Sequence, residues 1–573
     1  MKREPDFISN KNMLWDKSGR QYCFRGVSFC FTNNSSQNPP ALELSLENAD
    51  SYLSQLKQKG FNLIALQVFW KDIEQEGPEE YNEEYLAQLR LLLKKIEEYN
   101  ISVIIQPVFG NWGFGTAEDG CPAWTLKLIG INPETIQINF QDTTEKNLNN
   151  KLQFALYQKY ISSTMYTLFW AGKTFAPDFL VQGDNIQDYL QEHYISAMKH
   201  TARRIKDCNA VMGISFISRG DLGFVGINDL QDFSNYSIPM GKENFVCNTS
   251  AFEIIKNASG LQATYNVPQK IKLGILTQTN QNKTEGWEGG FSSGNCCPWE
   301  KLQIWHQTET KEAILDKPAY FSLKSKESFS EDYLKPFQMN FYDAFQKKHG
   351  RYLFLAESLS DKKHTYWEFG TEEMHKKLEA AEKEGGVIPD FNPEAEKIIF
   401  AYEIHSPEVN VFPQEIEKLG SCAIFYMFNF SEEIKKKISI KSDSLDIFFN
   451  YIDKNNLSFL LNANYTNQKE LIFLEESIEV FSRPYILNLW GTLLNFSFQK
   501  KPNLAIKIEW MSLPQSLDEI NFTEIFIPES LFPKGWKVEK FDGVGTVVYQ
   551  EEKQTLLITT VTEQRCMLRI ISK

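Results

Sequence analysis

Several features that would assign this chain to a particular class of protein are missing from it. No stretch reaches the ~18 consecutive apolar residues of a membrane-spanning helix, and the opening MKREPDFISNKNMLWDK lacks the apolar core of a secretory signal. The seven histidines lack metal-ligand spacing, so we expect no metal site and no cofactor. GVGTVV, near residue 543, is followed by no helical pattern, which argues against a phosphate-binding loop.

Positive charge is also in deficit. The chain has 60 Lys and Arg against 74 Asp and Glu, and a net charge of −14 argues against nucleic acid or an anionic membrane surface as a partner. Its nine cysteines are odd in number and irregularly spaced, which is typical of reduced thiols rather than of a disulfide framework. We therefore expect a cytoplasmic protein.

Apolar runs typical of buried strands alternate with amphipathic helical stretches over the first four hundred residues. FNLIALQVFW and ISVIIQPVF flank a helical pattern at residues 82–99, and NAVMGISFI follows another at residues 189–207. RYLFLAES, EKIIFAYEI and GSCAIFYMF are later runs of the same kind. Such alternation is typical of a parallel sheet, and this number of units predicts an α/β fold, a (β/α)8 TIM barrel over residues 1–475.

The pattern changes near residue 476. LNFSFQ, LAIKIEWM, TEIFIPE, GVGTVVYQ, TLLITTV and MLRIIS are short apolar runs separated by Pro, Gly and charged turns. This spacing predicts antiparallel strands, and we expect a C-terminal β-sandwich over residues 476–573.

A family resemblance rests on several longer runs. FNLIALQVFW is followed by GPEEYNEEYL, then by QPVFGNWGFGTAEDGCPAWTL, YTLFWAGKTFAPDF and NIQDYLQEHYISA; CCPWEKLQIW, RPY and TEIFIPE extend the match to the C-terminal region. With these runs the chain resembles the family 5 glycoside hydrolases, in the branch of endoglycoceramidases and cytosolic glucosylceramidases or steryl-β-glucosidases. The resemblance implies hydrolysis of β-glycosidic bonds with retention, by two carboxylates roughly 5–5.5 Å apart.

The same resemblance indicates that both catalytic glutamates are replaced. Ser218 and Arg219 stand where the family has the Asn and the Glu of its acid/base motif, and Ser421 stands at the position of the nucleophile. A guanidinium cannot act as the acid, because its pKa stays above about 12.

Supporting positions of the family site differ as well. Ala65 stands where the family has an Arg, and Val108 where it has a His. Glu403 and His405 fall on a family His and Tyr, and Leu461 on a family Trp. We therefore expect a catalytically inactive protein, a pseudoenzyme that serves as a structural or protein-interaction component.

Protein partners follow from that hypothesis. The abundance of Lys, Asn, Ile and Phe is typical of AT-rich genomes such as those of many protists, and in a ciliated host a large cytoskeletal assembly is one partner to expect. The residues themselves do not identify the partner.

One alternative is a module that binds a glycan or a glycolipid. Trp112, Trp124 and Trp299 could stack on a sugar in such a module. The discriminating observation is whether the barrel mouth is open or is plugged by the bulky residues Phe109, Phe114 and Arg219.

Another alternative is a divergent, active β-glucosidase or glucosylceramidase that acts on O-glycosyl bonds. Such an enzyme needs two other carboxylates that face each other at the strand ends. Glu357, Glu403 and Asp221 are placed near the ends of predicted strands and are the candidates.

Overall fold

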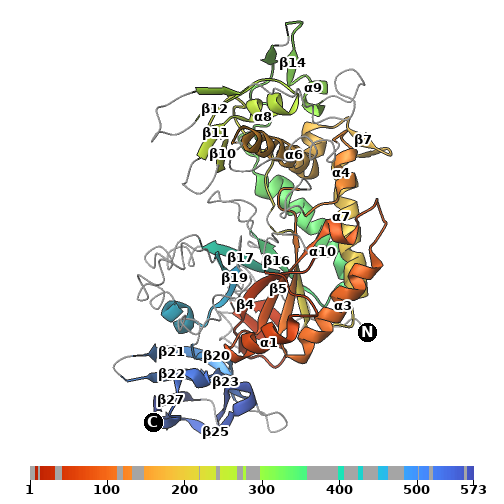
Figure 1. Cartoon of the computed structure of the whole chain (residues 1–573). Helices are drawn as coiled ribbons and strands as arrows, with labels where there is room; N and C mark the ends of the chain where they lie inside the picture. Colours follow the sequence, from red (N-terminus) through yellow and green to blue (C-terminus); the bar gives the residue numbers. More distant parts are fainter. Residues whose placement is uncertain are drawn as a thin grey trace.

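A computed structural model gives the arrangement of most of the chain (Figure 1). It describes residues 7–10, 13–32, 42–112, 120–131, 148–218, 220–239, 246–266, 275–278, 297–310, 312–357, 398–404, 424–429, 449–462, 483–500, 503–514, 521–560 and 564–573.

A parallel sheet forms the centre of the molecule. Its strands, in the order in which they pair, are β16 (Leu353–Glu357), β17 (Ile398–Ile404), β18 (Ile424–Asn429), β19 (Ser458–Asn462), β4 (Arg25–Cys30), β5 (Leu63–Phe69), β6 (Ser102–Val108) and β9 (Val211–Ser215). Because β9 also pairs with β16, the order returns to its first strand, and we refer to these strands as the ring. The predicted parallel sheet is confirmed, and its strand order is consistent with a TIM barrel.

Some of the described helices lie against the outside of the ring, and others lie at the end of the molecule opposite the C-terminal strands (Figure 1). They are α1 (Ala49–Gln58), α2 (Trp70–Ile73), α3 (Glu83–Glu98), α4 (Ala123–Lys127), α6 (Leu148–Phe175), α7 (Ile186–Arg204), α8 (Ala251–Ala258), α9 (Pro298–Lys301) and α10 (Lys335–His349), with a short π-helical turn at Ser330–Leu334. The predicted helix at residues 82–99 is α3, which begins where the Asn82 side chain accepts a hydrogen bond from the Tyr85 amide. Its apolar stripe, including Leu86, Leu89 and Leu93, is buried.

Small antiparallel sheets lie beside α6, α8 and α9, at the end of the molecule opposite the C-terminal domain (Figure 1). One consists of β10 (Tyr236–Pro239), β11 (Val246–Thr249), β12 (Ala263–Asn266) and β13 (Ile275–Gln278); the other two are the hairpins β7 (Leu180–Val181) with β8 (Asp184–Asn185) and β14 (Trp305–Gln307) with β15 (Ala313–Leu315).

The C-terminal domain consists of antiparallel strands, as predicted, in two sheets. They contain β20 (Tyr485–Leu489), β21 (Gly491–Gln499), β22 (Ala505–Ser512), β23 (Thr523–Phe526), β24 (Trp536–Asp542), β25 (Val544–Gln550), β26 (Thr555–Thr560) and β27 (Arg565–Ser572). Residues from both sheets, among them Ile486, Phe496 and Ile558, share one buried apolar cluster. The boundary at residues 475 and 476 stays a prediction.

Three strands from the start of the chain extend one of these sheets. β1 (Phe7–Asn10), β2 (Met13–Asp16) and β3 (Gln21–Tyr22) precede β20 in the seven-stranded order β1-β2-β3-β20-β23-β26-β25. Arg20 forms an ion pair with Glu524 of β23 at 2.7 Å. The C-terminal domain is therefore completed by residues from the other end of the sequence.

A buried cluster of charged residues, Arg25, Asp453 and Arg483, lies between the ring and the C-terminal domain. The two carboxylate oxygens of Asp453 bind different guanidinium groups: one accepts from Arg25, and the other from Arg483 Nε at 2.8 Å. All three side chains are at most 4% exposed. The Arg25 guanidinium also lies 3.9 Å from the ring centroid of Tyr485, whose hydroxyl donates to the Gly60 carbonyl. This charged cluster, together with Tyr485, links β4 of the ring to β20 of the C-terminal domain.

Candidate active site

The floor of the ring interior is apolar. Leu63 and Ala65 of β5, Ile104 of β6, Leu353 and Leu355 of β16 and Leu460 of β19 belong to one buried cluster. Side chains from strands on opposite sides can meet only inside the ring, so these residues mark its inner face.

A polar layer, consisting of Ser28, Gln67 and Gln106, lies above this floor. Each of these positions is two residues beyond Gly26, Ala65 or Ile104, so alternation along the strand gives it the same inner face. All three side chains are 0% exposed. The next inward positions, Cys30, Phe69 and Val108, form a second apolar cluster above the layer. On strands β4, β5 and β6, polar positions thus lie between two apolar levels.

Most of the polar layer is unpaired. Among the described residues, neither Gln67 Oε1, Gln67 Nε2 nor Ser28 Oγ has a hydrogen-bond partner. Leaving such a buried group unsatisfied costs about 1–3 kcal/mol. Native proteins keep few groups of this kind, and those that remain point to water or to a ligand.

Two glutamates occupy the carboxyl ends of neighbouring strands. Glu357 is the last residue of β16 and pairs in register with Ala401, and Glu403 follows two residues later in β17. Glu403 pairs with Met427, and Met427 with Leu460 of the apolar floor, so position 403 belongs to the inner face. Position 357, two residues beyond Leu355, has the same face. Catalytic residues of barrel enzymes come from these strand ends.

The sequence-predicted family positions divide between the two faces of the strands. Ala65 and Val108 lie inside the ring, in the lower and upper apolar clusters. Leu461 packs instead in the outer cluster, between the strands and the helices. Its neighbour Leu460 is the residue of β19 that faces the interior. Ser218 is 2% exposed and forms a bridge with Val108 where β9 and β6 end.

The remaining predicted positions, Arg219, His405 and Ser421, lie outside the described residues. Ser421 precedes Ile424, the first residue of β18, whereas barrel chemistry takes place where strands finish. The replacement of the family nucleophile by Ser421 stays a prediction.

The turn after β6 is held by backbone hydrogen bonds. Trp112 adopts a positive φ of 76°, which is rare for a bulky residue, and its amide donates to the Phe109 carbonyl at 3.1 Å. Gly120 closes the turn, since an added Cβ would lie 1.8 Å from the Val108 carbonyl oxygen. Only glycine fits at that position.

Three predicted sugar-stacking tryptophans are buried in the aromatic packing outside the ring. Trp112 and Trp299 are 0% exposed and Trp124 is 7% exposed. The indole N–H of Trp112 donates to Thr125 Oγ1, and that of Trp299 to Thr164 Oγ1, each at 3.0 Å. Protein contacts account for all three rings, and stacking on a sugar stays a prediction.

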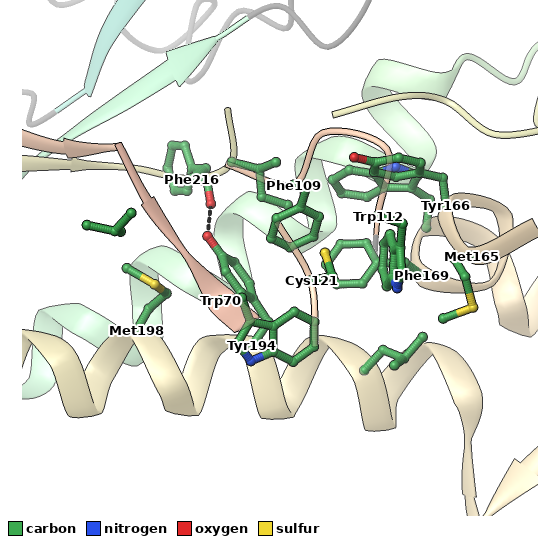
Figure 2. Packing of buried hydrophobic residues seen from close by; sticks show 14 of the residues in the cluster. Trp70, Phe109, Trp112, Cys121, Met165, Tyr166, Phe169, Tyr194, Met198 and Phe216 are labelled. Atoms are coloured by element: carbon green, nitrogen blue, oxygen red, sulfur yellow. Dashed lines mark hydrogen bonds between the residues drawn. The ribbon is translucent and has the colours of Figure 1, made fainter. Parts of the chain in front are cut away.

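Phe109 does not plug the barrel mouth. Its ring is buried between β6 and helices α6 and α7, against Trp70, Phe169 and Tyr194 (Figure 2). The Tyr194 hydroxyl donates to the Phe216 carbonyl and fixes α7 against the end of β9. The sequence expectation of bulk at the mouth was wrong for Phe109, because position 109 faces outward where position 108 faces inward.

Asp221, the third candidate carboxylate, is paired. Its Oδ2 lies 2.9 Å from Lys159 Nζ, with both side chains about a third exposed (33% and 34%). Burial acts to raise the pKa of Asp221, but the Lys159 ammonium and the amides of Gly223 and Leu222 outweigh it and hold that pKa below its ordinary value. Asp221 is therefore ionised at neutral pH and unsuited to donate a proton.

Neither a metal centre nor a membrane helix occurs in the part of the chain that the structure describes. No group of His, Cys, Asp or Glu there could hold a metal ion. No described helix is long and apolar enough to span a bilayer.

Comparison with known proteins gives both sequence and structural relatives. Residues 483–570 match the glycoside hydrolase family 5 C-terminal domain. The chain is 30% identical over 337 residues to a glucosylceramidase of Rhizopus delemar, covering 56% of this chain and 47% of the relative. It is 23% identical over 412 residues to the ergosteryl-beta-glucosidase of Saccharomyces cerevisiae, covering 59% and 53%. The chain thus spans about half the length of these curated relatives.

Two solved structures share the fold. Sterylglucosidase 1 of Cryptococcus neoformans superposes with a TM-score of 0.74 at 16% identity, covering 100% of this chain and 98% of that one. Endo-glycoceramidase II of Rhodococcus sp. gives 0.55 at 12% identity, covering 99% and 100%. At these identities the likeness establishes the fold alone.

The expectation of an inactive pseudoenzyme is corrected by these relatives. The matched proteins are named as glucosylceramidases and as an ergosteryl-beta-glucosidase, and these names point to an active glycosidase. The expectation rested on the alignment at Arg219 and Ser421, which lie outside the described residues, whereas Glu357 and Glu403, the alternative carboxylates, stand near the carboxyl ends of β16 and β17.

Proposed function

We propose that this chain, a relative of the family 5 glycoside hydrolases, hydrolyses the O-glycosyl bond of β-glucosides attached to a lipid, either a sterol or a ceramide. The substrate class comes from the names of its relatives, the glucosylceramidases and an ergosteryl-beta-glucosidase. In this proposal the ring strands and the helices packed on them form a complete (β/α)8 barrel within residues 1–475, with the reaction at its carboxyl end.

The observation that carries the proposal is the pair of strand-end glutamates. Neighbouring strands lie ~4.8 Å apart and rise ~3.3 Å per residue, so a two-residue offset separates the Cα atoms of Glu357 and Glu403 by roughly 8 Å. Flexible glutamate side chains at that separation can bring their carboxyl groups to the roughly 5–5.5 Å that a retaining mechanism requires.

Each carboxyl group has one task in the first step. One, protonated, donates its proton to the oxygen that links the glucose to the lipid, while the other, ionised, attacks the anomeric carbon. The lipid alcohol leaves and a glucosyl-enzyme ester remains. In the second step the first carboxylate takes a proton from water, the water oxygen attacks the anomeric carbon, and the ester bond breaks.

The geometry departs from the family pattern in its choice of strands. The resemblance places the acid/base after β9 and the nucleophile near β18, whereas the proposed pair stands on β16 and β17. The proposal therefore predicts a relocated pair and not the family glutamates.

Turnover of β-glucosides by purified variants tests this assignment. We expect hydrolysis of an aryl β-glucoside and of steryl glucoside or glucosylceramide by the unmodified protein, and a loss of at least about 10⁴-fold in kcat for Glu357→Gln and for Glu403→Gln. Asp221→Asn is the control, because Asp221 lies beyond the end of β9 and is already paired with Lys159. Arg219→Ala tests the position of the family acid/base.

The outcomes separate the explanations. Absence of turnover above background for all three substrates refutes the proposed activity. Turnover that survives Glu357→Gln and Glu403→Gln refutes the assigned pair while leaving the activity. Protein partners, including a cytoskeletal assembly, and a cytoplasmic location stay predictions from the sequence.

A further inference from the structure

Two side chains of the polar layer, those of Gln67 and Ser28, have no hydrogen-bond partner among the described residues. We propose that Gln67 and Ser28 bind hydroxyl groups of the glucosyl unit and form the floor of its subsite. This inference rests on the proposed function and names the residues that would recognise the sugar.

The position of these side chains is the first argument. Gln67 lies between Ala65 of the lower apolar cluster and Phe69 of the upper one, and Ser28 lies between Gly26 and Cys30 in the neighbouring strand. Cys30 and Gln67 pair in register, so the two polar positions are in adjacent strands of the same inner face. A shared location inside the ring makes them available to one ligand.

Their lack of partners is the second argument. Gln67 and Ser28 are both 0% exposed. Within the described part of the chain, both polar atoms of the Gln67 amide and the Ser28 hydroxyl oxygen have no hydrogen-bond partner. Buried amides and hydroxyls are almost always satisfied in native proteins. A group with complementary donors and acceptors is therefore expected in this layer.

The chemistry of the layer matches a neutral polyol. An amide offers N–H donors and a carbonyl acceptor side by side, and a serine hydroxyl does both. Each sugar hydroxyl also donates and accepts, so one amide can bind two neighbouring hydroxyls without any charged group. No Lys, Arg, Asp or Glu side chain belongs to the polar layer, which disfavours a phosphate or a metal ion.

The layer leads toward the proposed glutamates. Gln67 pairs with Gln106 of β6, and Ser215 of β9 pairs with Leu355, two residues before Glu357. Polar positions therefore continue around the ring from β4 to the strand that carries Glu357. The upper cluster of Cys30, Phe69 and Val108 covers the layer on the side of β4 to β6, so the sugar would approach from the side of β16 and β17.

The test uses glucosides that lack one hydroxyl at a time. For Gln67→Leu we expect kcat/KM on the aryl β-glucoside to fall about 100-fold, since a site built to bind a hydroxyl discriminates strongly against its loss. One deoxy analogue lacks the hydroxyl that Gln67 contacts. On this analogue we expect kcat/KM of the unmodified protein to be as low as that of Gln67→Leu on the parent glucoside, and Gln67→Leu to lower it no further. Ser28→Ala should show the same behaviour with a smaller loss.

Gln338→Leu is the matched control. Gln338 lies on α10, is 3% exposed, and its Oε1 likewise has no partner among the described residues. Its replacement should leave kcat/KM within about twofold for every substrate. Binding of the iminosugar deoxynojirimycin, measured by calorimetry, gives a second readout and should weaken for Gln67→Leu but not for Gln338→Leu.

Each result decides the question. Equal losses for Gln67→Leu on every deoxy analogue, or no loss on the parent glucoside, overturn the inference and assign the layer to internal water. If Gln67→Leu does not fold, as judged by circular dichroism, Gln67→Met and Ser28→Ala decide it in the same way. Absence of both turnover and iminosugar binding in the unmodified protein instead refutes the proposed function, and the inference with it.

Discussion

The charged cluster and the polar layer are both buried and polar, yet they differ in how their side chains are paired within the described part of the protein. In the charged cluster, Asp453 binds Arg25 with one oxygen and Arg483 with the other. In the polar layer, Gln67 and Ser28 have no partner among the described residues. The charged cluster lies where two domains join, whereas the polar layer faces the ring interior below the strand ends. In our proposal, the paired charges of the first site join two parts of the protein, whereas the unpaired groups of Gln67 and Ser28 are available to a ligand.

Breaking the charged cluster should give the largest effect. Asp453→Ala leaves two buried guanidinium groups without their shared carboxylate, and we expect a loss of about 3–5 kcal/mol in the free energy of unfolding. Chemical denaturation of the full chain measures it. Asp207→Ala is the control, because its pair with Arg90 is 44% exposed on both sides and should contribute less than about 1 kcal/mol. Equal losses of stability for Asp453→Ala and Asp207→Ala would contradict the expected difference between a buried and an exposed ion pair.

Replacing the unpaired amide should change stability in the opposite direction. Gln67→Leu removes two unsatisfied buried atoms, and we expect the free energy of unfolding to rise by about 1 kcal/mol. Gln191→Leu is the comparison, since its amide donates to the Phe169 carbonyl at 2.7 Å and its loss should destabilise by a similar amount. Thermal unfolding of the two variants, measured side by side, shows whether each substitution raises or lowers the stability. Destabilisation by both would show that Gln67 is satisfied in the folded protein.

The pair of Lys159 and Asp221 should give the smallest effect, one that depends on pH. Because the folded pKa of Asp221 is lowered, its contribution to stability is present above the unfolded value of about 3.9 and is lost as pH falls through the lower folded value. Lys159→Met should therefore destabilise at pH 6, by less than about 1 kcal/mol because water screens a pair that is a third exposed. The difference should shrink as pH falls further below the unfolded value. A constant difference across that range would argue against the ion pair.

The pattern of apolar and polar residues predicted the central strands and helices, because each of these elements depends mainly on its own residues. The runs FNLIALQVFW and ISVIIQPVF are β5 and β6, and Asn82 caps α3 where the helical pattern starts. By contrast, β3 has only two residues and pairs with β20, so no local signal could place it. Strands that short depend on a distant partner for their existence.

The candidate site was harder to predict because it depends on which face each residue takes. Val108 and Phe109 are adjacent, yet one lies inside the ring and the other in the outer cluster. A single-residue uncertainty in alignment therefore exchanges the interior for the exterior. Gln67 and Gln106 were overlooked, although each is a polar residue within an otherwise apolar strand at paired positions. Two polar residues at matching positions of neighbouring apolar strands could have predicted a polar layer inside the ring.

The pairing of β3 with β20 has a consequence for synthesis of the chain. Arg20, beside β3, bonds Glu524 across a separation of 504 residues. At ~5–20 residues per second, a ribosome needs roughly 25–100 s to make that span. During this time the N-terminal strands have emerged without their partner strand, and an unpaired strand edge is prone to aggregation. We expect nascent chains to depend on chaperones through this interval, and misassembly to begin at β1 to β3.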